Sequence, residues 1–335
     1  MTFKIYPNER ILIAGANGMA GSAICRSLLR RGYGDPKEDG LLLTPTRKDL
    51  NLLDSNAVDQ WFKENQPSVV VIAAAKVGGI LANASQPTEF LLENLKIQNN
   101  LIEAAWKAKV KRLLFLGSSC IYPKDAKQPI KEEYLLSGSL EKTNESYALA
   151  KISGIKLCEA LFKQHSFDAI CLMPTNLYGP GDNYNSHSSH VMAALIKRFS
   201  EAKKKSQKKV KCWGTGNPLR EFLYVDDLGD AVVFCLEKWD PKSEKAPKQS
   251  NGSPLLYLNV GTGKDISIKN LAEKISEIYQ YDGIIEWDNS KPDGTYRKLL
   301  NTKKINEMGW ESKTKLDEGL KKTITNYENN RIIPK

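Results

Sequence analysis

Short apolar runs recur along the chain, and polar stretches of helical length separate them. The runs are continuous rather than alternating, which is typical of strands buried on both faces of a parallel sheet. The stretches between them, such as residues 89–108 and 145–164, are long enough for crossover helices. The pattern therefore predicts an α/β fold built on a doubly wound parallel sheet. The runs that we expect as strands are residues 11–14, 41–43, 69–73, 113–116 and 169–173.

The pattern changes after Pro174, where residues 178–183 are rich in turn-forming glycine, proline and asparagine. We expect a smaller α/β substrate-binding lobe to begin there, and a loosely held tail to end the chain. The predicted division is a first domain of residues 1–177 with about 222–262, a lobe of residues 178–221 and 263–325, and a loose tail of residues 326–335.

The composition narrows the class of protein. The chain has 335 residues, of which 41% are hydrophobic and 26% are charged, as in globular proteins. No apolar run approaches the roughly 18 residues of a membrane span, and we expect a cytoplasmic protein without a membrane partner. The net charge of +10 indicates an anionic partner. The densest basic run, residues 203–209, has no interleaved aromatic residue, so we interpret it as a solvated loop and expect no nucleic-acid partner.

Three glycines, Gly15, Gly18 and Gly21, follow the first apolar run. Between a strand and a helix, such a loop lets the backbone approach a pyrophosphate, while the helix N-terminus offers free N–H groups. We therefore expect the sheet to be of Rossmann type and to bind a dinucleotide. After the second run, Arg47 stands where NAD enzymes carry an acid for the ribose hydroxyls, which favours NADP although Asp49 lies close by.

Tyr147 and Lys151 are four residues apart on a predicted helix, so both project from one face. A nearby ammonium is expected to lower the pKa of the phenol and to make Tyr147 a proton donor and acceptor near neutral pH. Tyrosine is followed four residues later by Lys or Arg at four places in the chain, but only this pair has a serine at a strand end ahead of it. We expect that serine, Ser118, to hydrogen-bond a substrate carbonyl, as in a nicotinamide reductase.

Cys120 indicates a second reaction in the same pocket. It lies two residues after Ser118, and both should face the same way because successive side chains alternate along a strand. A thiol can remove a proton from carbon if a bound carbonyl stabilises the carbanion as an enolate. Inversion of that carbon needs a second group on the opposite face, and His187 and His190 follow the exit from the sheet. A buried structural cysteine is the plain alternative.

Neither a metal site nor a disulfide framework is expected. The six cysteines show no Cys-x-x-Cys pair and no metal-ligand spacing. His187 and His190 could hold a metal only with further ligands, and no cysteine or paired carboxylate completes such a set.

These motifs resemble the extended short-chain dehydrogenase/reductase family over nearly the whole chain. The segments that carry the resemblance are residues 73–80 (AAAKVGGI), 118–123 (SSCIYP), 173–180 (MPTNLYGP), 213–216 (WGTG), 220–222 (REF) and 291–295 (KPDGT). The family often has an arginine at the position of Asn17, which leaves Arg47 as the expected ligand of a 2′-phosphate.

The resemblance implies a role for each matching residue. Ser118, Tyr147 and Lys151 would form a reductase triad. Cys120 would be the base and His190 the acid of an epimerisation. The GDP-sugar would be held by Arg198, Trp213, Arg220, Asp293 and Lys298. NADP would be bound by Gly15, Asn17, Gly18, Met19, Gly21, Arg47, Leu116, Gly117, Lys151, Pro174, Thr175, Asn176 and Leu177.

Within the family, the match is closest to enzymes that convert GDP-4-keto-6-deoxy-D-mannose to GDP-L-fucose. The resemblance implies epimerisation at C3 and C5, reduction of C4 with NADPH, and a homodimer. The main alternative is another nucleotide-sugar 4-epimerase or a 4,6-dehydratase, but a dehydratase usually has an acidic pair near the serine, and residues 117–123 contain neither Asp nor Glu. A non-catalytic NADP sensor is a further alternative, and it has no reason to keep Ser118, Tyr147 and Lys151 together.

Overall fold

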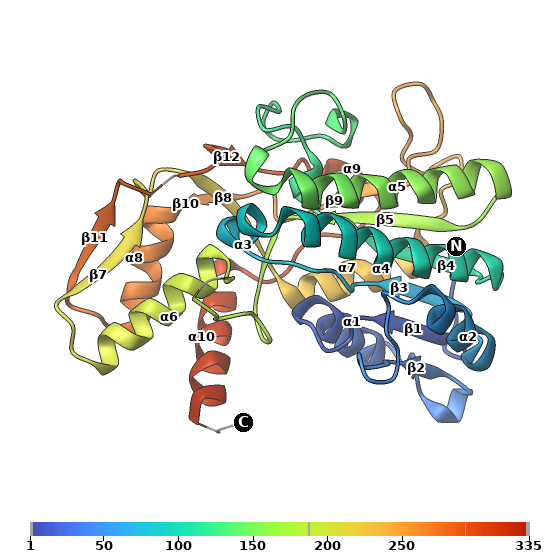
Figure 1. The fold of residues 1–335 in the computed structure, drawn as a ribbon, viewed down its shortest axis with the longest axis horizontal. Helices are drawn as coiled ribbons and strands as arrows, with labels where there is room; N and C mark the ends of the chain where they lie inside the picture. Colours follow the sequence, from blue (N-terminus) through green and yellow to red (C-terminus); the bar gives the residue numbers. More distant parts are fainter. Residues whose placement is uncertain (1–2, 187, 292, 333–335) are drawn as a thin grey trace.

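The computed structural model describes residues 3–186, 188–291 and 293–332. The larger part of the molecule is built around a parallel sheet, which has six strands in the described residues (Figure 1). Every residue of β3, β4 and β5 is buried, which explains why these strands are continuous apolar runs in the sequence apart from Arg112, the first residue of β4. The predicted Rossmann-type, doubly wound sheet is confirmed. In spatial order its strands are β2 (Leu41–Leu43), β1 (Arg10–Ala14), β3 (Val69–Ile72), β4 (Arg112–Leu116), β5 (Ala169–Pro174) and β9 (Tyr257–Val260).

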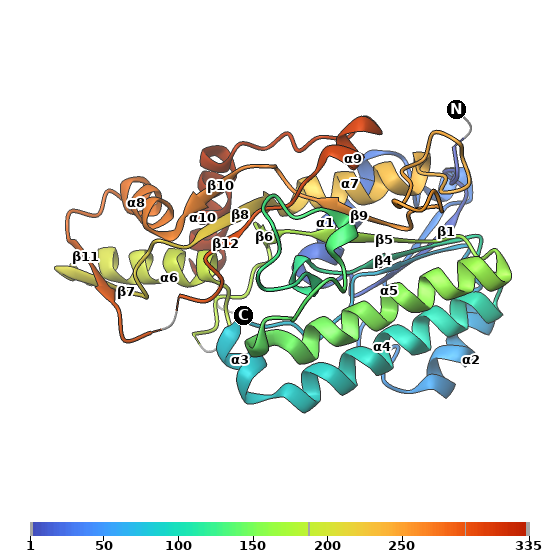
Figure 2. The ribbon, with the colours of Figure 1, turned by 90° about the horizontal axis from the view of Figure 1, so that it is seen from above.

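Helices cover both faces of this sheet (Figure 2). On one face α1 (Met19–Arg30) packs against α7 (Val225–Lys238), and on the other α4 (Pro87–Lys107) packs against α5 (Glu145–His165). Two further helices, α2 (Ser55–Asn65) and the short α3 (Ile80–Ser85), adjoin α4. None of the described helices is both long and apolar enough to cross a membrane.

Strands β2 and β3 lie on opposite sides of β1, so the order of the sheet reverses there. Open α/β sheets bind their ligands at the carboxyl ends of the strands beside such a switch point. The glycine loop follows β1, and Ser118 follows β4, at this same edge. The topology therefore brings the predicted cofactor loop and the predicted reductase residues to one end of the sheet.

The smaller part of the molecule has its own sheet and apolar core. β8 belongs to this smaller sheet, whereas α7 and β9, which follow β8 in the chain, belong to the larger part. Its helices are α6 (Val191–Lys204), α8 (Ile268–Tyr279) and α10 (Leu316–Ile332), whereas the short α9 (Lys303–Glu307) packs against β9 of the larger part. Its strands are β6 (Asn176–Tyr178), β8 (Leu219–Tyr224), β10 (Asp265–Ser267) and β12 (Arg297–Lys298), with a ribbon of β7 (Lys209–Trp213) and β11 (Ile284–Asp288).

The expected loose tail is wrong for residues 326–332, which continue α10. The ring of Tyr327 lies 4.1 Å from the ring of Tyr184. The carboxylate of Glu328 accepts hydrogen bonds from the hydroxyls of Ser200 and Tyr279. These contacts hold the end of the helix against α6 and α8.

Candidate active site

The glycine loop forms a tight backbone turn between β1 and α1. Gly15 has a φ of +88°, and its carbonyl accepts a hydrogen bond from the N–H of Gly18 at 3.0 Å. A Cβ at Gly21 would lie 2.1 Å from the carbonyl oxygen of Gly15, so only glycine lets α1 begin this close to the strand. Within the described residues no side chain caps the first turn of α1, and its N–H groups are free to meet a pyrophosphate. The loop therefore fits the phosphates of NADP.

Arg47 and Asp49 lie in the turn that follows β2. The Asp49 carboxylate accepts hydrogen bonds from the backbone N–H and the hydroxyl of Thr46, both at 2.8 Å, and these bonds lower the pKa of Asp49. Asp49 therefore holds the turn together, while Arg47 is exposed beside it. This arrangement favours the 2′-phosphate of NADP over the ribose hydroxyls of NAD.

Other residues expected at the cofactor lie at the carboxyl ends of β4 and β5. Leu116 is the last residue of β4, and Pro174 is the last residue of β5. The side chains of Thr175 and Asn176 donate hydrogen bonds to the carbonyl of Glu221, at 3.3 and 2.8 Å. These two side chains therefore join the end of the large sheet to β8.

Ser118 and Cys120 do not continue β4, which ends at Leu116. Ser119–Ile121 form a 3-10 turn, and the hydroxyl of Ser118 accepts a hydrogen bond from the N–H of Cys120 at 3.2 Å. The prediction that strand alternation aligns these two side chains is therefore wrong. They are neighbours because the serine caps the turn and folds the chain over the strand end.

Tyr147 lies in the first turn of α5 and is hydrogen-bonded to Ser118. Burial raises the pKa of the phenol, Cys120 adds to the increase, and the bond to Ser118 opposes it. The amine of Lys151 instead donates to the carbonyl of Leu116 at 2.7 Å, and burial lowers the pKa of this amine to about 7. The prediction that Lys151 lowers the pKa of Tyr147 is wrong in this arrangement, and the phenol stays protonated at neutral pH.

Two cations from the smaller lobe reach Cys120. The amine of Lys298, on β12, donates to the sulfur of Cys120 at 3.6 Å. Arg220, its partner in the register of β8 and β12, also faces the thiol. Burial lowers the pKa of Arg220, and the side chains of Cys120 and Asp293 oppose that change. The thiol therefore lies where the large sheet and the smaller lobe meet.

His190 occupies the N-terminal cap position of α6. The protein atoms around it lower the pKa of its imidazole, and the ammonium of Lys298 adds to the decrease. The preceding segment rests on Gly79, whose N–H donates to the carbonyl of Ser188 at 3.0 Å. A Cβ at Gly79 would lie 2.7 Å from the carbonyl oxygen of Ser189, so this glycine sets how closely the histidine segment approaches.

The residues expected to hold the GDP-sugar continue from the thiol to an exposed edge. Trp213, at the end of β7, is 44% exposed, and the guanidinium of Arg198 lies 5.2 Å from the centre of its ring. Lys291, which the sequence analysis did not single out, lies 5.7 Å from the same ring. Asp293 accepts hydrogen bonds from the N–H and the hydroxyl of Thr215, both at 2.7 Å, and so fixes the turn that follows Trp213.

Two buried side chains hold these parts together, and neither was among the predicted site residues. Asn259, on β9, accepts a hydrogen bond from the hydroxyl of Tyr122 at 2.6 Å and donates one to the carbonyl of Asn301 at 3.2 Å. A single polar residue within an apolar strand forms no motif, so no sequence signal marks such a scaffold. The other scaffold residue, Glu221 on β8, accepts hydrogen bonds at 2.6, 2.7 and 2.9 Å from the backbone N–H groups of Thr262, Gly263 and Leu300.

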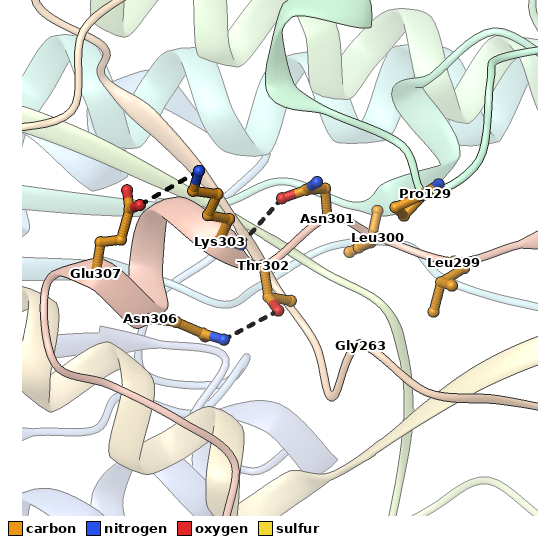
Figure 3. A pocket seen from close by; sticks show the side chains of 9 residues that line it. All are labelled: Pro129, Gly263, Leu299, Leu300, Asn301, Thr302, Lys303, Asn306 and Glu307. Carbon is orange, nitrogen blue, oxygen red and sulfur yellow. Dashed lines mark hydrogen bonds and ion pairs between the residues drawn. The ribbon is translucent and has the colours of Figure 1, made fainter.

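Two cavities differ in what lines them. Figure 3 shows a cavity of about 500 Å³ beside α9, where Lys303 pairs with Glu307 at 3.6 Å and where no residue predicted for the site is found. A much smaller space, about 10 Å³, is bordered by Cys120 and Lys298. The thiol and the amine thus share a confined space.

One residue considered in the sequence analysis, His187, lies outside the described residues.

The chain is similar to known proteins over nearly its whole length. The NAD dependent epimerase/dehydratase family matches residues 11–247. The chain is 49% identical to the probable GDP-L-fucose synthase 1 of Oryza sativa subsp. japonica, over 97% of this chain and 94% of that protein. It is 47% identical to the GDP-L-fucose synthase of Escherichia coli (strain K12), over 94% of this chain and 95% of that protein. Among solved structures it resembles MlghC, a GDP-mannoheptose C4 reductase from Campylobacter jejuni with NADP bound, with 34% identity, a TM-score of 0.82 and coverage of 97% of this chain and 99% of that chain.

Proposed function

This chain belongs to the NAD dependent epimerase/dehydratase family, and on that premise we propose that it converts GDP-4-keto-6-deoxy-D-mannose to GDP-L-fucose with NADPH. The reaction inverts C3 and C5 of the sugar and reduces its C4 carbonyl. The expected resemblance to the extended short-chain dehydrogenases/reductases is confirmed. Two relatives that match nearly the whole chain are GDP-L-fucose synthases by name, and a similar solved structure holds NADP.

One observation carries the assignment of residues: a thiol and a phenol lie beside the same serine. Ser118 is hydrogen-bonded to the backbone of Cys120 and to the side chain of Tyr147. A carbonyl bound at Ser118 is therefore close to both groups. That carbonyl acidifies the carbons on either side of it and is also the group that accepts a hydride. A simple reductase does not need the thiol, whereas an epimerase-reductase uses both.

In the epimerase half, Cys120 is the base and His190 is the acid. Cys120 removes the proton from the carbon next to the carbonyl, and the electron pair moves onto the oxygen, where Ser118 and Tyr147 hold the enolate. His190 returns a proton to the opposite face. Its lowered pKa makes the imidazolium a stronger acid, which favours transfer of that proton to carbon.

In the reductase half, bound NADPH supplies the hydride that reduces C4. Tyr147, which burial keeps protonated, donates its proton to the carbonyl oxygen. Ser118 orients that oxygen through a hydrogen bond. Lys151, one helical turn further along α5, holds the nicotinamide ribose.

The smaller lobe supplies the site for the GDP-sugar in this proposal. Arg198 and Arg220 suit the diphosphate, because guanidinium groups pair bidentately with phosphate oxygens. Residues 1–177 with about 222–262 form the cofactor unit, apart from the parts of β6 and β8 that pair in the smaller sheet, and residues 178–221 and 263–325 form the substrate unit. The protein acts as a cytoplasmic homodimer.

A labelling experiment tests the assignment. The protein is mixed with GDP-4-keto-6-deoxymannose and NADPH in heavy water, the loss of NADPH absorbance is followed, and the product is analysed by mass spectrometry. We expect oxidation of the cofactor together with deuterium at C3 and C5. Oxidation without label would leave only a C4 reductase, and label without oxidation would leave only an epimerase. Either outcome contradicts the proposed function.

A further inference from the structure

Lys298 lies directly against the sulfur of Cys120. Its Nζ donates to Sγ at 3.6 Å, and both side chains border the same confined space. Among the described residues no carboxylate pairs with this amine, whereas the preceding Arg297 pairs with Asp265 at 2.6 Å. The charge of Lys298 is therefore not neutralised by an acid. An ammonium that donates to a sulfur atom stabilises negative charge on that atom.

Hydrogen bonds to buried or partly buried side chains hold the backbone of the two residues that follow Lys298. The N–H of Leu299 donates to the amide oxygen of Gln128 at 2.9 Å, and the N–H of Leu300 donates to the buried carboxylate of Glu221 at 2.9 Å. β12 also pairs with β8 at Lys298 itself. The backbone that carries Lys298 is therefore held in place by the protein itself.

Two other groups face the sulfur, from different elements. Tyr147 approaches from α5, and Arg220 approaches from β8. The phenol is neutral at neutral pH, and the guanidinium also faces Asp293, which offsets part of its charge. Lys298 is thus the cation with a hydrogen bond to the sulfur.

We propose that Lys298 is a catalytic residue of the epimerase half, whose ammonium holds Cys120 as the thiolate that removes the proton from carbon. This inference rests on the function proposed above, and it differs from the role in holding the GDP-sugar that the family resemblance implies. In the step, an S–H bond forms while the C–H bond breaks, and the electron pair of the C–H bond moves to the carbonyl oxygen. The captured proton then leaves to solvent, and the same ammonium restores the thiolate for the second carbon.

The test measures the reactivity of Cys120 in the absence of substrate and NADPH. Iodoacetamide is added to the folded protein at neutral pH, and mass spectrometry follows alkylation of the peptide that contains Cys120. We expect Lys298→Met to slow alkylation about tenfold, because a neighbouring opposite charge favours the ionised form by that factor or more. Lys298→Arg, which keeps the charge, should retain most of the reactivity. Lys298→Gln replaces the methionine variant if that variant does not fold.

Lys124→Met is the matched control. Lys124 lines the same confined space, but its amine pairs with Glu141 at 3.6 Å. We expect this variant to alkylate at the native rate. If the alkylation rate fell equally in both variants, the reactivity of Cys120 would depend on the overall positive charge of the site and not on the contact with Lys298. If Lys298→Met alkylated at the native rate but had a raised KM, Lys298 would be a substrate ligand only. Either result overturns the proposal, whatever reaction the enzyme proves to catalyse.

A second readout comes from the titration of His190, which also requires no turnover. The ammonium of Lys298 adds to the effect of the surrounding protein atoms in lowering the pKa of this imidazole. NMR titration should therefore show the pKa of His190 rising in Lys298→Met and staying at its native value in Lys124→Met. An unchanged titration in Lys298→Met would mean that the ammonium is not in this part of the site in solution, and it would contradict the proposal.

Discussion

The two halves of this active site are assembled in different ways. The groups proposed for epimerisation come from three separate places: Cys120 from the turn after β4, His190 from the start of α6, and Lys298 from β12. The groups proposed for reduction are Ser118, Tyr147 and Lys151, which come from one strand end and one helix of the larger part. In this proposal hydride transfer depends on neighbouring elements of one part of the molecule, whereas inversion at carbon depends on how the smaller lobe meets the sheet.

The largest effect should follow from removing the phenol on the reductase side. Tyr147→Phe deletes the proton donor to the C4 oxygen, while Ser118 can still bind the carbonyl. We expect NADPH oxidation to fall about 1000-fold, because general acid catalysis contributes about 100- to 10,000-fold. Deuterium should still enter C3 and C5 in heavy water. If label and oxidation disappear together, the two halves do not act separately.

A smaller loss should follow from changing the thiol on the epimerase side. In Cys120→Ser we expect deuterium uptake at C3 and C5 to fall about 100-fold, since the base for carbon is lost. Fluorescence titration should show native binding of NADPH, and an already epimerised 4-keto sugar should still be reduced. Normal exchange in this variant would rule out the thiol as the base.

A change outside the reacting groups should affect the epimerase half alone. A methyl group at Gly79 would lie 2.7 Å from the carbonyl oxygen of Ser189 and would push the segment that carries His190 outward. We expect Gly79→Ala to lower deuterium uptake about tenfold, because small displacements of a catalytic group are costly. Reduction of the already epimerised sugar serves as the internal control. A matching loss of reduction would mean that Gly79 supports the whole site.

The smallest effect is expected in the pH dependence of the free energy of unfolding, through the buried amine of Lys151. Burial lowers the pKa of Lys151 from its ordinary value of 10.5 to about 7. Between these two values the unfolded chain binds more protons than the native protein, so the free energy of unfolding should rise with pH, by up to about 1.4 kcal/mol per pH unit. Lys151→Met should lack this part of the slope in urea denaturation of the cofactor-free protein. Identical slopes in both proteins would mean that the amine is not buried as described.

The sheet and the reductase group could be predicted because their signals are local. β3 and β4 are buried on both faces, so each shows an unbroken apolar run. Tyr147 and Lys151 share a helical spacing, and Ser118 follows a strand end, so neighbouring residues are enough to group them. The glycine loop is equally local, because Gly21 must be small where it meets Gly15.

The epimerase side could not be predicted in the same detail, because its contacts join distant segments. Lys298 and Cys120 are 178 positions apart, and their contact exists only once β12 has paired with β8. The contact between Gly79 and Ser188 likewise depends on how the lobe docks. The direction of the pKa of Tyr147 was mispredicted for a related reason: burial, which the sequence does not show, raises it, and the amine of Lys151 is bound to the carbonyl of Leu116 instead.

Glu221 stands where the polypeptide passes between the two sheets. Its buried carboxylate ties β8 to the turn after β9 and to the segment after β12, and separating these pieces would strand an acid without its donors. Leu300, one of the three donors, follows Lys298 by two residues. The burial of one carboxylate therefore couples the packing of the smaller lobe to the place where Lys298 meets Cys120.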